Sequence, residues 1–139
     1  MKKIFIFLII ILSPSFLFAH DYSIGDLIID HPMLKKNAKN AKGFLMITNK
    51  GNEDIYLLDG RSFFSNEIEL HRSSNTNQNT MYLVDKIKVP ANSSISFKDL
   101  NYHIMFYNYD KKLKWFEDHG AILKFSNNQQ IEIKFDLNE

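Results

Sequence analysis

The sequence predicts an all-β domain folded as a Greek-key β-sandwich. Three observations lead to this fold class: short segments alternate apolar and polar residues, polar clusters separate them, and no stretch of a dozen residues carries a helical apolar stripe. Alternation with a period of two places one face of a strand in the core and the other in water. About eight such strands within one domain favour a sandwich with Greek-key connections.

The predicted strands follow one another from residue 44 to residue 137. They are expected at residues 44–49, 55–58, 67–70, 81–89, 95–97, 103–107, 121–125 and 131–137. The last is the clearest, because its odd positions are apolar and its even positions are charged. The breaks are rich in turn-forming residues, as in Pro90-Ala91-Asn92-Ser93. Residues 35–42, rich in lysine and asparagine, are expected to form a solvated connection and not a binding patch.

The N-terminus has the layout of a secretory signal peptide. Lys2 and Lys3 precede an apolar run, Ile4 to Leu12, and the segment ends on the small residue Ala19. We therefore expect a signal peptide at residues 1–19, cleaved after Ala19. An uncleaved membrane anchor is the alternative, but the run is shorter than the roughly 20 residues that span a bilayer. A lipoprotein is excluded because no cysteine is present to carry the lipid.

Residues 20–139 are then a single exported domain, which we expect in the periplasm without stable membrane insertion. This length suffices for one compact domain and not for two. The whole chain has 17 basic and 16 acidic side chains, so it lacks the basic excess of a nucleic-acid-binding protein. Without cysteine there are no disulfides, and burial of apolar side chains has to stabilise the fold.

Two histidines and two methionines form the candidate functional site: His71, Met81, His103 and Met105. Thioether sulfur binds hard cations poorly and binds Cu(I) well, so this set indicates copper handling. His103 and Met105 are two positions apart and therefore share one face of a strand. If Ile104 points into the core, both point away from it and are expected to be exposed. His71 and Met81 are expected at the ends of two neighbouring strands.

Each of these four residues also has an ordinary structural interpretation. Methionine commonly fills a core, and a histidine is often a surface or hydrogen-bonded residue. The combination, not any single member, favours a metal site. A metal-free β-sandwich used for adhesion or interaction stays open as the alternative. In that case a group of aromatic residues would line the binding surface, namely Tyr102, Phe106, Tyr107, Tyr109 and Trp115.

The sequence resembles the periplasmic copper chaperones of the PCuAC type, which are cupredoxin-like β-sandwiches that bind Cu(I). Their signature ends in a Met, twenty-one residues and a His-x-Met, and here 21 residues separate Met81 from His103-Ile104-Met105. The segment Ala41 to Gly51 is similar to the family's glycine-aromatic strand that ends in Thr-Asn-x-Gly. The resemblance covers nearly all of residues 20–137.

Three positions depart from the family pattern. Nine residues separate His71 from Met81, one fewer than in the family pattern. Arg72 follows His71, where the family often has an acidic residue or methionine. Asn101-Tyr102 stands where glycines are common before the His-x-Met. These departures bear on the geometry of the loops more than on the ligand set.

The resemblance implies a function in copper supply. His71, Met81, His103 and Met105 would bind Cu(I), and the protein would pass it to a copper acceptor such as the copper subunit of a haem-copper (cytochrome c) oxidase or an assembly factor of that subunit. It implies no enzymatic activity, and we expect a monomer.

Two other copper functions compete with this interpretation. An electron-transfer cupredoxin needs a cysteine thiolate beside two histidines, and this chain has no cysteine. Cleavage after Ala19 would make His20 the N-terminal residue, whose amine and imidazole would chelate Cu(II) as in copper-brace oxidases. A frayed first residue is the simpler interpretation. His31 and His119 are expected to be structural.

Overall fold

The computed structural model describes residues 21–77, 80–109 and 119–138, and within them the chain forms twelve strands in two sheets. The larger sheet contains β1 (Tyr22–Ile24), β2 (Leu27–Lys36), β3 (Ala41–Asn49), β5 (Glu67–Ser73), β6 (Met81–Leu83), β8 (Ser93–Ser96), β9 (Tyr102–Tyr107) and β12 (Asp136–Asn138). The smaller sheet contains β4 (Ile55–Ser62), β7 (Ile87–Val89), β10 (Gly120–Phe125) and β11 (Gln130–Lys134). No helix in the described part is long and apolar enough to cross a membrane.

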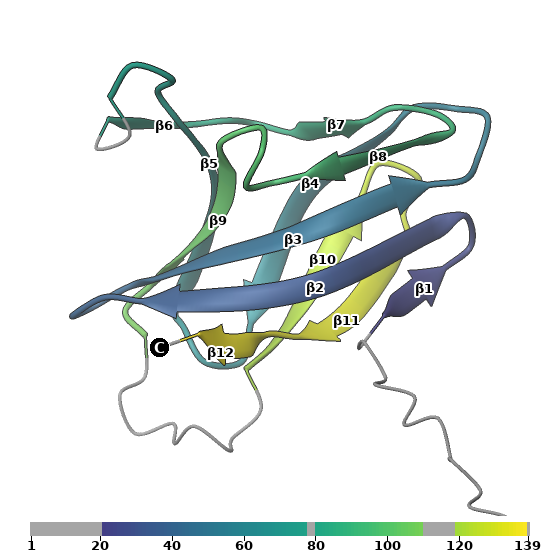
Figure 1. Cartoon of the computed structure of the whole chain (residues 1–139). Helices are drawn as coiled ribbons and strands as arrows, with labels where there is room; N and C mark the ends of the chain where they lie inside the picture. Colours follow the sequence, from purple (N-terminus) through teal and green to yellow (C-terminus); the bar gives the residue numbers. More distant parts are fainter. Residues whose placement is uncertain (1–20, 78–79, 110–118, 139) are drawn as a thin grey trace, which may run out of the picture.

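The two sheets lie one in front of the other, with β2 and β3 in front of β10 and β11 (Figure 1). Strand order is β1-β2-β3-β9-β5-β6 in the larger sheet, with β12 beside β2 and β8 beside β3, and β11-β10-β4-β7 in the smaller. The chain crosses from one sheet to the other several times, for example between β3 and β4 and again between β4 and β5. The prediction of an all-β Greek-key sandwich is confirmed.

The core fills the space between the sheets. On β9, Ile104 and Phe106 are fully buried, and on β3 the corresponding side chains are Leu45 and Ile47. Their neighbours along each strand point to the other face of the larger sheet. The smaller sheet contributes the buried residues Leu57, Ile87, Val89, Ala121, Leu123, Phe125, Ile131 and Ile133.

Two predicted strands are each divided between the sheets. The expected strand 81–89 consists of β6, which pairs with β5 in the larger sheet, and β7, which pairs with β4 in the smaller. The expected strand 131–137 likewise divides into β11 and β12 at Phe135. A period of two reports burial on one face but not which sheet is involved, so this pattern does not reveal where a chain changes sheets.

Strands β1 and β2 were missed by the sequence analysis. In β2 the pairing with β3 shifts register between Asp30 and Met33, and His31 adopts a φ of 50°. This irregularity interrupts the alternation that would have revealed the strand. The solvated connection expected at residues 35–42 was also wrong in extent, because Lys35 and Lys36 end β2 and Lys42 lies in β3.

The end of β3 shows why its Thr-Asn-x-Gly sequence suits this fold. The Asn49 side chain is fully buried, and its amide donates hydrogen bonds to the carbonyl oxygens of Glu53 (2.7 Å) and Val89 (3.2 Å). Its Oδ1 accepts a hydrogen bond from the Gly51 N–H at 2.9 Å. Asn49 thereby ties the end of the larger sheet to β7 in the smaller sheet, with its buried polar atoms paired.

Candidate metal centre

His71 and His103 face each other on adjacent strands. β5 and β9 run antiparallel, the two histidines are directly opposite, and their ring centroids are 5.4 Å apart. Leu70 and Ile104, the neighbouring opposed pair, are buried in the core. Because side chains alternate along a strand, the histidines point to the outer face of the larger sheet. The predicted orientation of His103 is therefore confirmed.

The exposure expected for His103 and Met105 was wrong, and His71 is covered as well. His71 is 7% exposed, His103 2% and Met105 4%. The cover comes from other side chains on the same outer face, since the ring of Phe44 on β3 lies 6.3 Å from that of His103 and the ring of Tyr107 lies 6.3 Å from that of His71. The outer face of the sheet is thus locally as closed as a core.

Met105 and Met81 extend the outer-face group in two directions. Met105 shares the outer face with His103 and lies opposite Glu69 of β5. Met81 begins β6 and lies opposite Ser73, two pairs along from His71 and therefore on the same face. Such diagonal neighbours across two strands are about 7–8 Å apart, within reach of a long side chain.

Met81 differs from the other three candidate ligands in its exposure. Its side chain is 37% exposed on the edge strand of the larger sheet, whereas the other three are almost fully covered. Met81 begins a strand, as predicted. His71 does not end one, because β5 continues past it to Ser73. The structure therefore brings His71, His103 and Met105 together in a covered group with Met81 at its open side.

Two imidazole nitrogens in this group have no hydrogen-bond partner among the residues that the structure describes. His71 Nδ1 and His103 Nε2 are both buried and unpaired. A buried polar atom without a partner costs about 1–3 kcal/mol, so such atoms call for an explanation. Two of them on directly opposed histidines, beside a buried thioether, fit a soft metal ion that accepts nitrogen and sulfur ligands.

Histidine and carboxylate groups alone do not complete such a site. Within the described residues, no set of three or more His, Cys, Asp or Glu side chains is placed to hold a metal ion. Further ligands for a metal bound by His71 and His103 are then of another kind, and the thioethers of Met105 and Met81 are soft groups on this face in β9 and in the strand beside β5.

Glu69 fixes the orientation of His71. Its carboxylate accepts hydrogen bonds from His71 Nε2–H at 2.6 Å and from the Tyr107 hydroxyl at 3.0 Å. These two bonds hold the pKa of Glu69 below its ordinary value, so the carboxylate is charged at neutral pH. With the proton on Nε2, the lone pair of a neutral His71 is on Nδ1. A carboxylate behind a histidine is a recurrent feature of metal sites.

The sequence analysis missed Glu69. The signal was its position two residues before His71, on the same face of the strand. Strand periodicity alone would have found it once His71 was placed inside β5.

Burial lowers the pKa of His103 to about 4, with smaller contributions from the positive charges of Lys42 and His71. An imidazole in this position stays neutral in mildly acidic solution. Its nitrogen is therefore available to a metal ion at a pH where an ordinary histidine is protonated.

The free energy of unfolding of the metal-free protein is expected to fall as the pH falls from about 6.5 to about 4. In this window the unfolded chain binds a proton at His103 that the folded chain does not. The stability that a neutral His103 contributes is therefore fully present above pH 6.5 and is lost below pH 4. The gap between the two pKa values corresponds to about 3 kcal/mol. Urea unfolding at several pH values measures it. His103→Gln should flatten this slope, and an equally steep slope in that variant would contradict the assignment.

The departures from the family pattern leave the ligand group intact. Arg72 points away from His71, and its guanidinium lies over the Tyr102 ring, 5.2 Å from the centroid. Asn101 adopts a φ of 60°, a left-handed conformation that glycine adopts freely and that asparagine tolerates. Asparagine can therefore replace the glycine in the turn before His103.

The remaining histidines lie outside this group. His119 is buried, stacks on Tyr109 and is hydrogen-bonded to its hydroxyl, which agrees with the structural role expected for it. His31 is exposed at the irregularity in β2. His20, the candidate Cu(II) chelator, and the signal peptide at residues 1–19 fall outside the described residues.

The aromatic residues proposed for an interaction surface do not form one in the described part of the chain. Phe106 and Tyr109 are buried in the core, and Tyr102 and Tyr107 are half-buried. Trp115 is outside the described residues.

The fold matches solved PCuAC domains. The copper-bound PCuAC domain from PmoF2 superposes with a TM-score of 0.72 at 17% identity, over 86% of this chain and 97% of that one. The apo PCuAC domain from PmoF1 gives 0.72 at 20% identity, over 86% and 98%. The Cu(I) form of DR1885 from Deinococcus radiodurans gives 0.64 at 14% identity, over 86% and 81%. The expected cupredoxin-like PCuAC fold is confirmed.

Sequence comparison identifies the family. No curated protein matches the chain. The family described as "Putative lipoprotein LpqE-like" matches residues 24–137, which include all four candidate ligands and Glu69. Since the match spans most of the sequence, the chain belongs to the LpqE-like family.

Proposed function

We propose that this protein is an exported, non-enzymatic Cu(I) chaperone whose ligands are His71, His103, Met105 and Met81. The observation that carries the proposal is the pair of buried, unpaired nitrogens, His71 Nδ1 and His103 Nε2, on directly opposed residues beside Met105. Neutral imidazole and thioether ligands suit a monovalent soft ion and add no charge to it. The copper-bound PmoF2 domain and the Cu(I) form of DR1885, which share the fold, support this choice of metal.

The unequal exposure of the ligands suits transfer rather than permanent storage. Met81 is on an open edge strand, while His71 and His103 are covered. An incoming ligand from an acceptor can displace the Met81 thioether first, without opening the rest of the site. The ion then stays bound by the covered ligands until the acceptor supplies more.

The acceptor belongs to the same compartment as the exported protein. We place that compartment in the periplasm, after removal of residues 1–19. The acceptor that we propose is the copper subunit of a haem-copper (cytochrome c) oxidase or an assembly factor of that subunit, and the chaperone acts on it as a monomer.

A Cu(I) titration under reducing, anaerobic conditions against a chromophoric chelator tests the proposed metal binding. We expect one tight equivalent in the unaltered protein. We expect none in the variant that combines His71→Ala, Met81→Ala, His103→Ala and Met105→Ala, while its β-rich circular dichroism persists. Absence of tight binding in the unaltered protein would reject the chaperone and favour a metal-free interaction domain.

Glu69→Ala is expected to weaken Cu(I) binding by about 10–100-fold, because His71 loses the acceptor that holds its Nε2–H. Glu69→Gln should retain most of the affinity, since its amide oxygen accepts the same bond. Glu67→Ala, an exposed carboxylate on the same face of β5, is the matched control. Nitrogen NMR of the metal-free protein should show the His71 proton on Nε2. A proton on Nδ1 would contradict this arrangement.

A further inference from the structure

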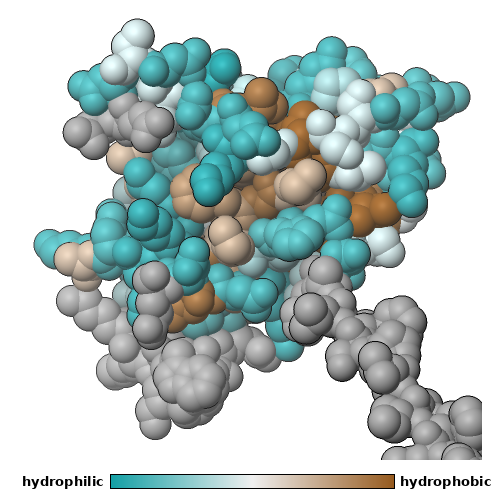
Figure 2. Space-filling view, in the orientation of Figure 1, coloured by the Kyte–Doolittle hydropathy of each residue, from teal (hydrophilic) through white to brown (hydrophobic). Residues whose placement is uncertain are grey.

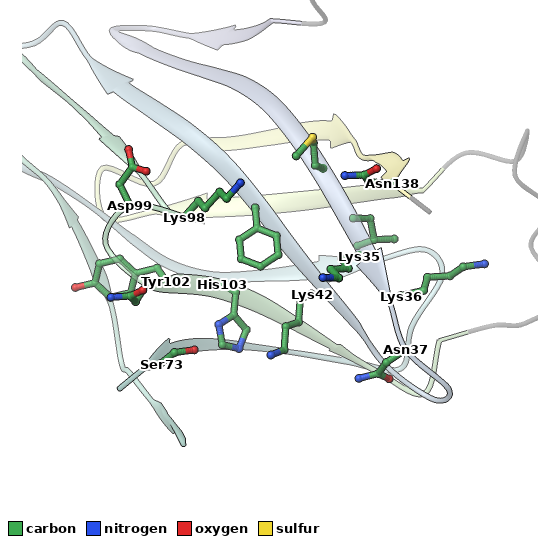
Figure 3. A pocket seen from close by; sticks show the side chains of 14 residues that line it. Lys35, Lys36, Asn37, Lys42, Ser73, Lys98, Asp99, Tyr102, His103 and Asn138 are labelled. Carbon is green, nitrogen blue, oxygen red and sulfur yellow. The ribbon is translucent and has the colours of Figure 1, made fainter. Parts of the chain in front are cut away.

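A groove beside the candidate copper ligands carries the further inference. Its cavity volume is about 720 Å³, and it runs over the outer face of the larger sheet, from the end of β2 across β3 to β9. Met33, Phe44 and Tyr102 give it apolar walls, and His103 lines it at one end. Figure 3 shows the His103 ring between Ser73 and Lys42, so the groove leads to the buried histidine.

The polar lining of the groove is mainly cationic. Lys35, Lys42 and Lys98 line it from β2, β3 and the turn between β8 and β9, and Figure 3 shows their side chains around one opening. Lys36 also lines it, but its ammonium lies 5.1 Å from the Tyr109 ring centroid. Asp99 is the only acidic residue among the described residues that line the groove.

The lysine charges in the groove are not neutralised within the described residues. The ion pairs found among the described residues join His71 to Glu69 and Lys88 to Asp54, and neither involves a lysine of the groove. Lys42 of β3 is directly opposite Met105 of β9, so its ammonium group lies on the same face as the proposed ligands. The groove therefore combines a concentrated positive potential with the apolar walls formed by Met33, Phe44 and Tyr102, directly beside the proposed metal ligands.

We infer that this groove binds an acidic, partly apolar segment of a partner polypeptide, lying over Phe44 with its carboxylates on Lys35, Lys42 and Lys98. This inference rests on the proposed function for the identity of the partner, which is the copper acceptor. A segment seated here has its end at His103, where an acceptor ligand has to arrive. Charge complementarity between the segment and the lysines would set the orientation and the rate of encounter.

A polypeptide fits the groove better than an anionic membrane surface does. Membrane headgroups would meet exposed Lys35 and Lys98 at the rim, but a flat surface does not reach the recessed His103. A flat membrane surface would also leave the apolar walls of the groove uncovered. Figure 2 shows apolar side chains in the middle of this side of the molecule with hydrophilic ones around them, a pattern that suits an occupant with both kinds of side chain.

The test uses the metal-free full chain and a short fluorescein-labelled peptide that is rich in glutamate and has phenylalanines at its centre. Fluorescence anisotropy measures binding. We expect the peptide to bind, and the same peptide with lysine in place of glutamate not to bind. The triple variant Lys35→Gln, Lys42→Gln, Lys98→Gln should bind roughly tenfold more weakly. The matched variant Lys50→Gln, Lys86→Gln, Lys124→Gln removes the same charge outside the groove and should bind normally.

The result separates this inference from the proposed function. A chain that binds Cu(I) but not the glutamate peptide overturns the groove assignment and leaves the chaperone intact. A chain that binds the peptide through the three lysines but takes up no Cu(I) supports the groove and rejects the copper acceptor as its partner. Equal weakening in both triple variants would reduce the effect to net charge and overturn the inference. Binding only to phosphatidylglycerol vesicles would also overturn it, and would assign the lysines to lipid.

Discussion

Replacing His103 by alanine is expected to weaken Cu(I) binding by more than about a hundredfold, since even the loss of a residue that merely supports a ligand costs 10–100-fold. His103 is the most deeply buried of the four candidates, and its Nε2 has no other partner. Water cannot easily take its place at the metal. Competition with a chromophoric Cu(I) chelator measures the change, and a His103→Ala protein with unaltered affinity would rule out this residue as a ligand.

Met81→Leu is expected to have a smaller effect, about tenfold, because an exposed ligand on an edge strand is the easiest for water or buffer to replace. Met46→Leu is its matched control. Met46 is 38% exposed, close to the 37% of Met81, and it lies on the same outer face of the larger sheet but away from the histidines. Equal losses in the two methionine variants would mean that Met81 is not a ligand.

Phe106→Ala is expected to lower the free energy of unfolding by about 3–5 kcal/mol. Phe106 is fully buried on the core side of β9, where its ring packs 4.8 Å from that of Phe64 and 5.3 Å from that of Phe135. A Cβ at Gly43 would come within 2.7 Å of it, so the ring also lies against the backbone of β3. Its removal leaves a cavity between β9 and the smaller sheet. Urea unfolding of the metal-free protein measures the loss.

Phe63→Ala provides the control for that measurement. Phe63 is 60% exposed, so its truncation is expected to change the free energy of unfolding by less than about 1 kcal/mol. If Phe106→Ala cost no more than Phe63→Ala, the packing of β9 described above would be wrong.

The sequence predicted the candidate ligands better than their surroundings. Residue type and strand periodicity were enough to place His103 and Met105 on one face, because both are local properties. The same local rule gave the wrong exposure, since Phe44 and Tyr107 cover this face from other positions in the chain. The groove lysines were not recognised, because their proximity to the histidines arises from pairing between distant strands. Glu69 was missed although it is local, since its place on the face of His71 follows only once β5 is known to continue through His71.

The fold class was predictable and the division of strands between sheets was not. The alternation that identifies residues 131–137 continues through Phe135, although β11 and β12 pair with different sheets. Met81 shows the consequence for the site. It belongs to the short β6, whose pairing with β5 brings it near His71, while the rest of the expected strand 81–89 pairs in the smaller sheet.

Because His71 and His103 are paired across β5 and β9, the candidate site exists only in the folded chain. The two residues are far apart in the sequence, and β6, β7 and β8 are formed by the chain between them. The unfolded chain brings them together only at a cost in loop-closure entropy, so under the proposed function it should bind Cu(I) far more weakly than the folded chain. Any ion held by both histidines therefore stabilises the folded state, by an amount that grows with the logarithm of its concentration relative to its Kd. If the proposed function holds, the copper-bound protein should resist heat and proteases better than the metal-free protein, and a chaperone that has delivered its ion should be the less stable form.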